Sequence, residues 1–254
     1  MPSIEPSPPE GPGPSARIAL WLLAALGLCL LVFNAYYFFI RRGVGPDYYL
    51  KRAFSRPSDT ILDDPLYRDY AEEYQRLNAK LSGRKVIVFA GDSITRRFKL
   101  EEYFPDHPVV NRGIFSDTTL GLLKRLDHTV NNLSIGQLFI MIGYNDLRYR
   151  DNEEILRNVD QILSRCKADR IIVQSLLPVA GTRPETNARI LQMNAGLQDL
   201  CRKHRCEYLD LHRPFARGEA IDPAYTRDGA HPNAAGYELW AGIICGVLEK
   251  RDTD

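Results

Sequence analysis

The chain lacks the features that mark several large classes of protein. Its 254 residues carry a formal net charge of only +1, and no stretch has the composition of a nucleic-acid-binding surface. Its five cysteines include no C-x-x-C pair and have no histidines at the spacing of a zinc site, so we expect no metal. No internal repeat is present. These absences favour an ordinary globular domain, and 44% hydrophobic residues suffice for it to bury a core.

The first 40 residues differ in composition from the rest of the chain. Residues 1–17 are rich in proline and contain no apolar run, which predicts a disordered tail. Residues 18–40 contain no charge, and at 1.5 Å per residue they would extend about 34 Å, against roughly 30 Å for a hydrocarbon core. We therefore expect one transmembrane helix. The alternative, a cleaved signal peptide, is disfavoured by the length of the run and by the lack of a small-x-small site after it.

The charges that flank this segment predict its orientation. Arg17 is the only basic residue before it, whereas five lysines and arginines lie between residues 41 and 56. The positive-inside rule then places the following domain on the cytoplasmic side of the membrane. The opposite side stays open, because a single anchor followed by a large domain can defeat the rule.

A linker, residues 41–84, precedes that domain and contains one predicted helix. Asp64 and Pro65 have the pattern of an N-cap followed by proline at the first helical position. Apolar and aromatic residues then fall on one face: Tyr67, Tyr70, Ala71, Tyr74, Leu77 and Leu81. We expect this face to pack on the domain, since a free helical stalk would not need an aromatic stripe.

From residue 85 onward, short apolar runs alternate with helix-like segments. The expected strands are Lys85–Gly91, Val109–Asn111, Gln137–Met141, Ile171–Gln174 and Glu207–Leu209. The expected helices lie near 118–126, 152–166, 186–204 and 233–249. Such alternation predicts a parallel sheet with helices on both sides.

Polar motifs follow several of these strands. Ser93 comes directly after the first, a glycine-containing loop follows the second, Asn145 follows the third, and His231 lies beyond the last. Each alone is explained by turn or cap chemistry. Together they place a hydroxyl, an imidazole and an amide at the carboxyl edge of one sheet, which is where parallel α/β sheets bind ligands.

In their order along the chain these motifs resemble those of the SGNH hydrolases, the GDSL-type esterase and lipase superfamily. The matching blocks are Gly91-Asp92-Ser93-Ile94, Gly113, Gly143-x-Asn145-Asp146 and Asp228-x-x-His231. The resemblance covers residues 85–249, and the Asn-Arg-Gly-Ile and Asp-Thr-Thr sequences are most similar to the platelet-activating-factor acetylhydrolase branch. Relatives often have glycine where this chain has Ser116.

The resemblance implies a flavodoxin-like three-layer α/β/α sandwich with a five-stranded parallel sheet for residues 85–254. It also implies a serine esterase in which Ser93 attacks the ester carbonyl, His231 takes its proton and Asp228 orients the imidazole. The oxyanion would be bound by the backbone N–H groups of Ser93 and Gly113 and by the side-chain amide of Asn145. No organic cofactor or metal is implied.

The connections are short and leave no segment for a lid, so we expect a shallow site. Its walls would be Ile94, Phe115 and Tyr144, and it would favour short acyl groups, acetyl above all, on a carbohydrate or lysolipid alcohol. Two alternatives stay open, an O-acyltransferase that uses the same residues and an inactive membrane scaffold. Arg96 and Arg97 could face an anionic group, although a solvated helix turn is the simpler interpretation. Cys201 and Cys206 would form a disulfide only outside the cytoplasm.

Overall fold

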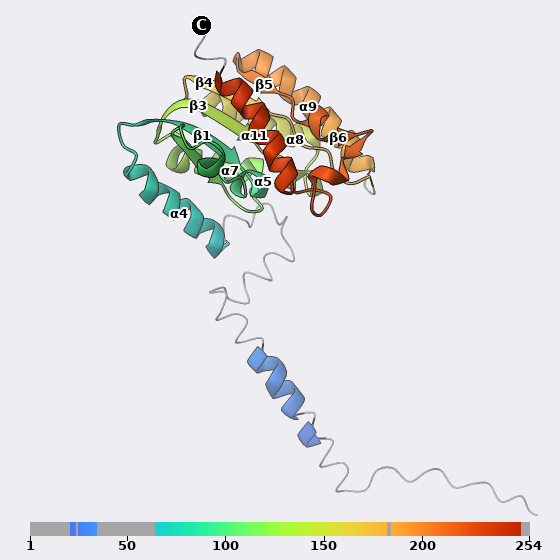
Figure 1. Cartoon of the computed structure of the whole chain (residues 1–254). Helices are drawn as coiled ribbons and strands as arrows, with labels where there is room; N and C mark the ends of the chain where they lie inside the picture. The colour runs from blue at the N-terminus through green and yellow to red at the C-terminus, as the bar shows by residue number, and fades with distance from the viewer. Residues whose placement is uncertain (1–20, 24, 35–63, 182–183, 250–254) are drawn as a thin grey trace, which may run out of the picture. The chain divides into compact units, whose positions relative to one another are not determined.

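The computed structural model describes residues 21–23, 25–34, 64–181 and 184–249 (Figure 1). The chain divides into two compact units, Met1–Leu50 and Lys51–Asp254. The predicted disordered tail, residues 1–17, and most of the predicted linker lie outside the described residues.

The prediction of a membrane-spanning segment is contradicted. Residues 21–23 and 25–34 are helical, and the remainder of 18–40 lies outside the described residues. Within the described ranges, no helix combines the length and the apolar character needed to cross a membrane. The predicted single-pass membrane localisation is corrected accordingly.

The larger unit is built on a five-stranded parallel sheet, as predicted. Its strands are β1 (Lys85–Gly91), β2 (Val109–Gly113), β3 (Ser134–Met141), β4 (Arg170–Gln174) and β5 (Glu207–Leu209). The spatial order is β2-β1-β3-β4-β5, and all neighbouring pairs are parallel. The chain therefore leaves β1 toward one edge of the sheet and returns to β3 on its other side. Ligands bind beyond the carboxyl ends of the strands at such a switch point.

The long helices lie where the sequence predicts them, whereas several short elements were not predicted. The helices are α4 (Pro65–Ala79), α5 (Ser93–Arg96), α6 (Leu100–Tyr103), α7 (Thr119–Thr129), η2 (Asn145–Arg148), α8 (Asn152–Arg165), α9 (Pro184–His204), α10 (His212–Phe215), η3 (Pro223–Tyr225) and α11 (Ala234–Glu249). A two-stranded antiparallel hairpin joins β6 (Ala216–Arg217) to β7 (Ala220–Ile221). The additions are all four residues or shorter, a length at which sequence periodicity carries little information.

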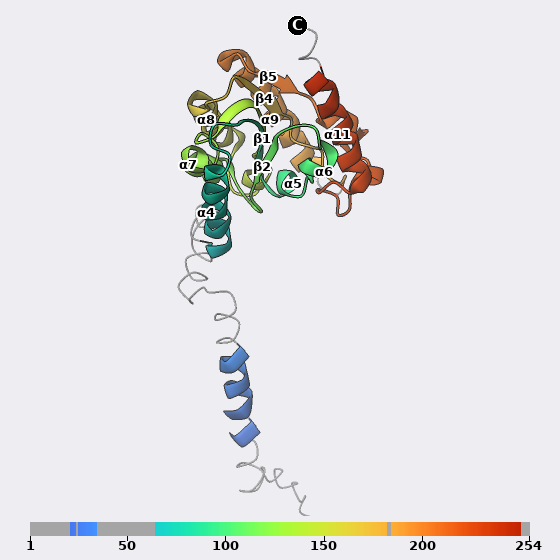
Figure 2. The same ribbon diagram turned by 60° about the vertical axis from the view of Figure 1, so that its left-hand side comes forward.

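Helices cover both faces of the sheet, so the unit has three layers (Figure 2). Val86 and Val88 of β1 point into a core shared with α7, α8 and α9. Ile87 and Phe89, which alternate with them, point into a second core shared with α5, α6 and α11. This alternation follows from the two-residue period of a strand that is buried on both faces.

Helix α4 packs against the rest of this unit, as its aromatic face predicts. Its N-cap is Asp64, whose side chain accepts a hydrogen bond of 2.9 Å from the Leu66 N–H group. Tyr67 and Tyr74 are buried and form a small cluster with Ile114, the residue that follows β2. The helix also lies beside α7, an arrangement visible in Figure 2. It therefore covers the segment that leaves the carboxyl end of β2.

Candidate active site

The turn after β1 presents Ser93 at the edge of the sheet. Gly91 ends the strand without a side chain, because a Cβ atom there would collide with the Thr95 side chain and the Met141 carbonyl oxygen. Asp92 then caps α5, and its Oδ1 accepts a hydrogen bond of 2.9 Å from the Ile94 N–H group. Ser93 is the first helical residue and is half-buried. Its backbone N–H has no partner within the helix, since the first turn of a helix leaves its N–H groups free.

His231 reaches this serine from the loop before α11. Its Nε2 atom lies 3.0 Å from the Ser93 hydroxyl oxygen, and its Nδ1 atom lies 2.8 Å from Oδ2 of Asp228. The structure thus brings together three residues that are separated by up to 138 positions in the sequence. This chain of contacts has the geometry of a catalytic triad, with the hydroxyl as nucleophile, the imidazole as general base and the carboxylate as the group that orients the imidazole.

The loop itself holds the carboxylate in its ionised form. Partial burial disfavours the charge on Asp228, but its oxygens accept hydrogen bonds from the N–H groups of His231 and Ala230 at 2.8 and 3.0 Å, and from the His231 ring. These contacts prevail and lower the pKa of Asp228 to about 2. At neutral pH the imidazole therefore faces a full negative charge, which favours a proton on Nδ1 and leaves Nε2 able to accept one.

Asn145 lies at the start of η2, after β3, and its amide is held by the neighbouring loops. The Asn145 Nδ2 atom donates to the Asp117 carbonyl oxygen at 2.9 Å and has a longer contact of 3.4 Å with Oδ2 of Asp92. One of its two N–H groups is thus committed to Asp117. The other N–H group makes only the long contact with Asp92 among the described residues.

Three buried carboxylates, those of Asp92, Asp117 and Asp146, lie next to these residues and bond to their loops. Burial raises the pKa of Asp92 to about 7, and the charges of Asp117 and Asp146 add to this effect. Burial likewise raises the pKa of Asp146 to about 6, although Thr119 donates two hydrogen bonds of 2.8 Å to it. Asp117 is paired with buried Arg125 at 2.8 Å. These groups fix the loops that carry Asn145 and the residues after β2.

The backbone N–H group of Gly113, a predicted oxyanion donor, already has a hydrogen-bond partner in the structure. Its N–H group donates to Oδ1 of Asn111 at 2.9 Å, so this donor is already engaged. A Cβ atom at position 113 would lie against the backbone of Arg96, 2.8 Å from its Cα atom. Glycine is thus required here for the close approach of β2 to the serine turn.

The predicted pocket walls fall into two groups. Ile94 is only 5% exposed and packs into the core on the α11 side of the sheet, where its side chain offers almost no surface to a pocket. Phe115 and Tyr144 are half-buried and remain at the surface of the loops after β2 and β3. That Phe115 and Tyr144 line a substrate pocket stays a prediction.

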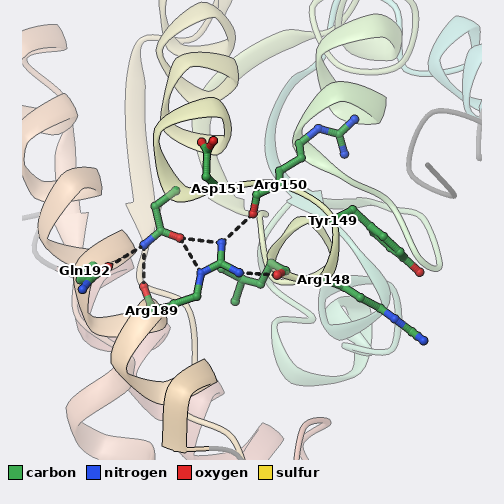
Figure 3. Close-up of a pocket in the computed structure, with 8 residues that line it drawn as sticks. Arg148, Tyr149, Arg150, Asp151, Arg189 and Gln192 are labelled. Atoms are coloured by element: carbon green, nitrogen blue, oxygen red, sulfur yellow. Dashed lines mark hydrogen bonds between the residues drawn. The ribbon is translucent and has the colours of Figure 1, made fainter. Parts of the chain in front are cut away.

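A surface pocket of about 550 Å³ lies beside η2 and the start of α8 (Figure 3). It is lined by Leu147, Arg148, Tyr149, Arg150, Asp151, Asn152, Arg189 and Gln192. Arg189 is tied to its neighbours, donating to the Arg150 carbonyl oxygen at 2.6 Å and to Oδ1 of Asn152 at 2.9 Å. None of the predicted site residues lines this pocket, so we do not identify it with the candidate active site.

Of the other groups that could carry chemistry, His204 has a structural partner, whereas the buried Nε2 atom of His212 has no hydrogen-bond partner in the described part of the chain. His204 lies 2.6 Å from Asp160, and burial lowers the pKa of His212. All five cysteines fall within the described ranges and are free thiols, Cys201 and Cys206 included. Across the described part of the chain, no three His, Cys, Asp or Glu residues gather in a way that could hold a metal ion.

A family model and several solved structures match this chain. The model of the GDSL-like Lipase/Acylhydrolase family matches residues 89–239, a range that contains Ser93, Asn145, Asp228 and His231. A solved GDSL-like lipase from Bacteroides thetaiotaomicron is 26% identical, with a TM-score of 0.64, and the alignment covers 73% of this chain and 98% of that one. A structure from Streptococcus pneumonia named for platelet activating factor is 25% identical, with a TM-score of 0.66, and covers 76% and 99%.

A curated relative is similar over part of its length. The N-acylneuraminate cytidylyltransferase of Streptococcus agalactiae is 29% identical over 166 residues, which are 64% of this chain and 38% of that protein. The chain thus spans well under half of this relative, and the similarity concerns one part of it.

Proposed function

Because the chain belongs to the GDSL-like lipase/acylhydrolase family and is thereby a carboxylic ester hydrolase, we propose that it cleaves esters through Ser93, His231 and Asp228. The observation that carries this proposal is the 3.0 Å contact between the Ser93 hydroxyl and His231 Nε2. A hydroxyl becomes an effective nucleophile only when a base removes its proton, and Nε2 is within hydrogen-bond reach of it. Asp228 holds the ring orientation and stabilises the imidazolium that forms.

The reaction proceeds in two halves. Ser93 Oγ attacks the ester carbonyl carbon while its proton moves to His231 Nε2, and the resulting tetrahedral intermediate expels the alcohol, which takes that proton from His231. A water molecule then gives a proton to His231 and attacks the acyl-serine. The second intermediate collapses, its bond to Ser93 Oγ breaks to release the acid, and Ser93 Oγ takes the proton back from His231 Nε2.

Two donors are proposed for the oxyanion. The Ser93 N–H lies in the first turn of α5, and the Asn145 amide is oriented by its bond to Asp117. Both are positioned before substrate arrives, which is the condition under which such donors lower the barrier most. The Gly113 N–H would first have to release Asn111, so we assign it a smaller part.

The proposed substrates are short-chain esters, with acetyl as the preferred acyl group. A longer chain gains about 0.8 kcal/mol per CH₂ removed from water, but only where an apolar channel receives it. Burial of Ile94 in the core supports a site without such a channel, with Phe115 and Tyr144 as its remaining apolar walls. Specificity would then lie in the alcohol part, a carbohydrate or a lysolipid head group.

A series of nitrophenyl esters from acetate to palmitate tests this proposal. We expect kcat/KM to fall beyond butyrate and to be lost for every ester in Ser93→Ala. A steady rise toward palmitate would contradict the short-chain specificity. Unchanged turnover in Ser93→Ala would contradict the mechanism.

A further inference from the structure

Two arginines follow the candidate nucleophile and have no part in the proposed chemistry. Arg96 and Arg97 stand three and four residues after Ser93, a spacing that places side chains on the same face of a helical turn. Arg97 continues the turn of α5 in a helical conformation, and its N–H group donates to the Ser93 carbonyl oxygen at 3.2 Å. The same turn therefore carries two guanidinium groups and the serine hydroxyl.

Each guanidinium lies over an aromatic ring. The Arg96 Cζ atom is 5.1 Å from the centre of the Tyr70 ring, and the Arg97 Cζ atom is 5.5 Å from the centre of the Phe115 ring. The two rings contact each other, with their centres 6.1 Å apart. Tyr70 belongs to α4 and Phe115 to the loop after β2, so three distant segments of the chain build this surface. We call these four residues the Arg96–Arg97 platform.

The platform carries positive charge without a described counter-charge. In the ranges 64–181 and 184–249, neither arginine forms an ion pair, and the Arg96 Nε atom is buried without a hydrogen-bond partner. By contrast, the buried guanidinium of Arg125 is paired with Asp117. A buried N–H donor without an acceptor costs free energy, so the Arg96 side chain is not fully satisfied by the protein.

The loop that carries His231 also contains Arg227, whose backbone N–H group donates to the His231 carbonyl oxygen at 3.1 Å. The Tyr237 hydroxyl donates to the carbonyl oxygen of Ile94 at 2.8 Å, directly behind the serine turn. Burial raises the pKa of Tyr237, and the charges of Arg97 and Arg227 both oppose that rise.

We propose that the Arg96–Arg97 platform binds an anionic group of the substrate's alcohol part, a carboxylate or a phosphate. This inference rests on the proposed esterase function and names the substrate class of that site. An acetyl group has no position for a charge, so the anion belongs to the alcohol. Guanidinium groups bind carboxylate and phosphate through paired N–H donors, and the rings of Tyr70 and Phe115 offer a flat surface to the body of the alcohol.

Matched acetate esters test the inference on the full chain. The substrates are methyl 4-acetoxybenzoate, which is neutral, 4-acetoxybenzoate, which carries a carboxylate, and 4-acetoxyphenyl phosphate. We expect a higher kcat/KM for at least one anionic ester than for the neutral one. Arg97→Gln and Arg96→Gln should each lower this preference about tenfold, the usual effect of removing one charge-assisted hydrogen bond. A preference for only one of the two anionic esters supports the inference and shows whether the platform binds a carboxylate or a phosphate.

Arg148→Gln is the matched control, because Arg148 also lies over an aromatic ring, 5.6 Å from the centre of Tyr149, but belongs to η2 and the surface pocket. It should keep the wild-type preference. Loss of the preference in Arg148→Gln, or its persistence when Arg96 and Arg97 are both replaced, would overturn the inference. Turnover of the neutral ester with no anionic preference would overturn it while leaving the esterase proposal intact. Absence of turnover for all three esters would refute both.

Discussion

The Tyr74 hydroxyl donates a hydrogen bond of 2.5 Å to the carbonyl oxygen of Gly113. This contact joins α4, which lies outside the range matched by the family model, to the last residue of β2. Arg112 strengthens the junction, because its guanidinium lies 4.7 Å from the centre of the Tyr74 ring and its Nε donates to the Asn78 side chain at 2.9 Å. Helix α4 is therefore held against β2 by a hydrogen bond and by ring contacts, and is not a free spacer before the domain.

Removing that hydroxyl should destabilise the protein. Tyr74→Phe leaves the ring in place but deprives a buried carbonyl of its donor, at a cost of about 1 to 3 kcal/mol in the free energy of unfolding. Urea denaturation measures the loss. Tyr149→Phe is the control, since the Tyr149 hydroxyl makes no hydrogen bond to the described residues. Equal stability of Tyr74→Phe and wild type would contradict the role given to this bond.

Ser93 and His231 should act as one catalytic unit. Either alanine variant is expected to lose nearly all turnover, and the double variant should lose little more, because neither group works without the other. Steady-state kinetics with nitrophenyl acetate measures kcat/KM for the two single variants and for the double variant. Losses that multiply in the double variant would mean that the two residues act independently.

Asn145→Ala should lower kcat by on the order of 10² to 10³, the usual effect of removing one oxyanion donor. Asn158 provides a control from the same region, because its amide donates to the Thr119 hydroxyl at 3.0 Å and is not assigned to the oxyanion. Asn158→Ala should leave kcat within a few-fold of wild type. A similar kcat for both variants would remove Asn145 from the oxyanion site.

Much of the site could be predicted from the sequence because parallel strands end at a common edge. Ser93 and Asn145 follow β1 and β3, which are neighbours in the sheet, so topology alone brings them together. Gly113 shows the limit of this reasoning. A glycine at position 113 is needed for close approach to the Arg96 backbone, and this need could not be told from the sequence, while its oxyanion role stays a prediction.

The burial of single side chains, a buried ion pair and the membrane span were harder to predict from the sequence. Ile94 follows the nucleophile and could equally have lined a pocket, but the side chain turns into the core beside Phe98. Asp117 has the pattern of a helix cap, and nothing local predicts its pairing with Arg125 eight residues later. The uncharged run of residues 18–40 predicted a membrane span, but no helix in the described ranges is long and apolar enough to cross a membrane.

Replacing Ser116 with glycine should stabilise the protein. Ser116 has a φ of 59°, in the left-handed region that costs a residue with a Cβ atom roughly 1 to 2 kcal/mol. Glycine relieves this strain but loses more chain entropy on folding, which leaves a net gain of about 0.5 kcal/mol. Ser164→Gly, in the exposed face of α8, should instead destabilise by about 0.5 kcal/mol. Thermal denaturation shows whether each variant is more or less stable than wild type. A less stable Ser116→Gly variant would contradict the claim that Ser116 is strained.

The buried carboxyl of Asp92 should make stability depend on pH. Its pKa in the folded protein, about 7, lies above its ordinary value of 3.8, so folding favours the protonated form. The stabilisation is therefore complete below about pH 4 and is lost as the pH rises through about 7. Asp146 contributes in the same direction.

Asp92→Asn removes this titration while keeping an acceptor for the Ile94 N–H group. Between about pH 5 and pH 8, the free energy of unfolding should fall less steeply in the variant than in wild type. Urea denaturation across this pH range gives the two slopes. Equal slopes would show that Asp92 is ionised throughout.

The central claim is that Ser93 is the nucleophile, and covalent labelling of the full chain by a fluorophosphonate tests it most directly. Such a probe reacts with a serine whose proton a neighbouring base removes. Intact mass and peptide mapping should show one adduct on Ser93 of the folded protein, with none in Ser93→Ala and little in His231→Ala. A folded wild-type protein that stays unlabelled, or that is labelled at another residue, would contradict the account.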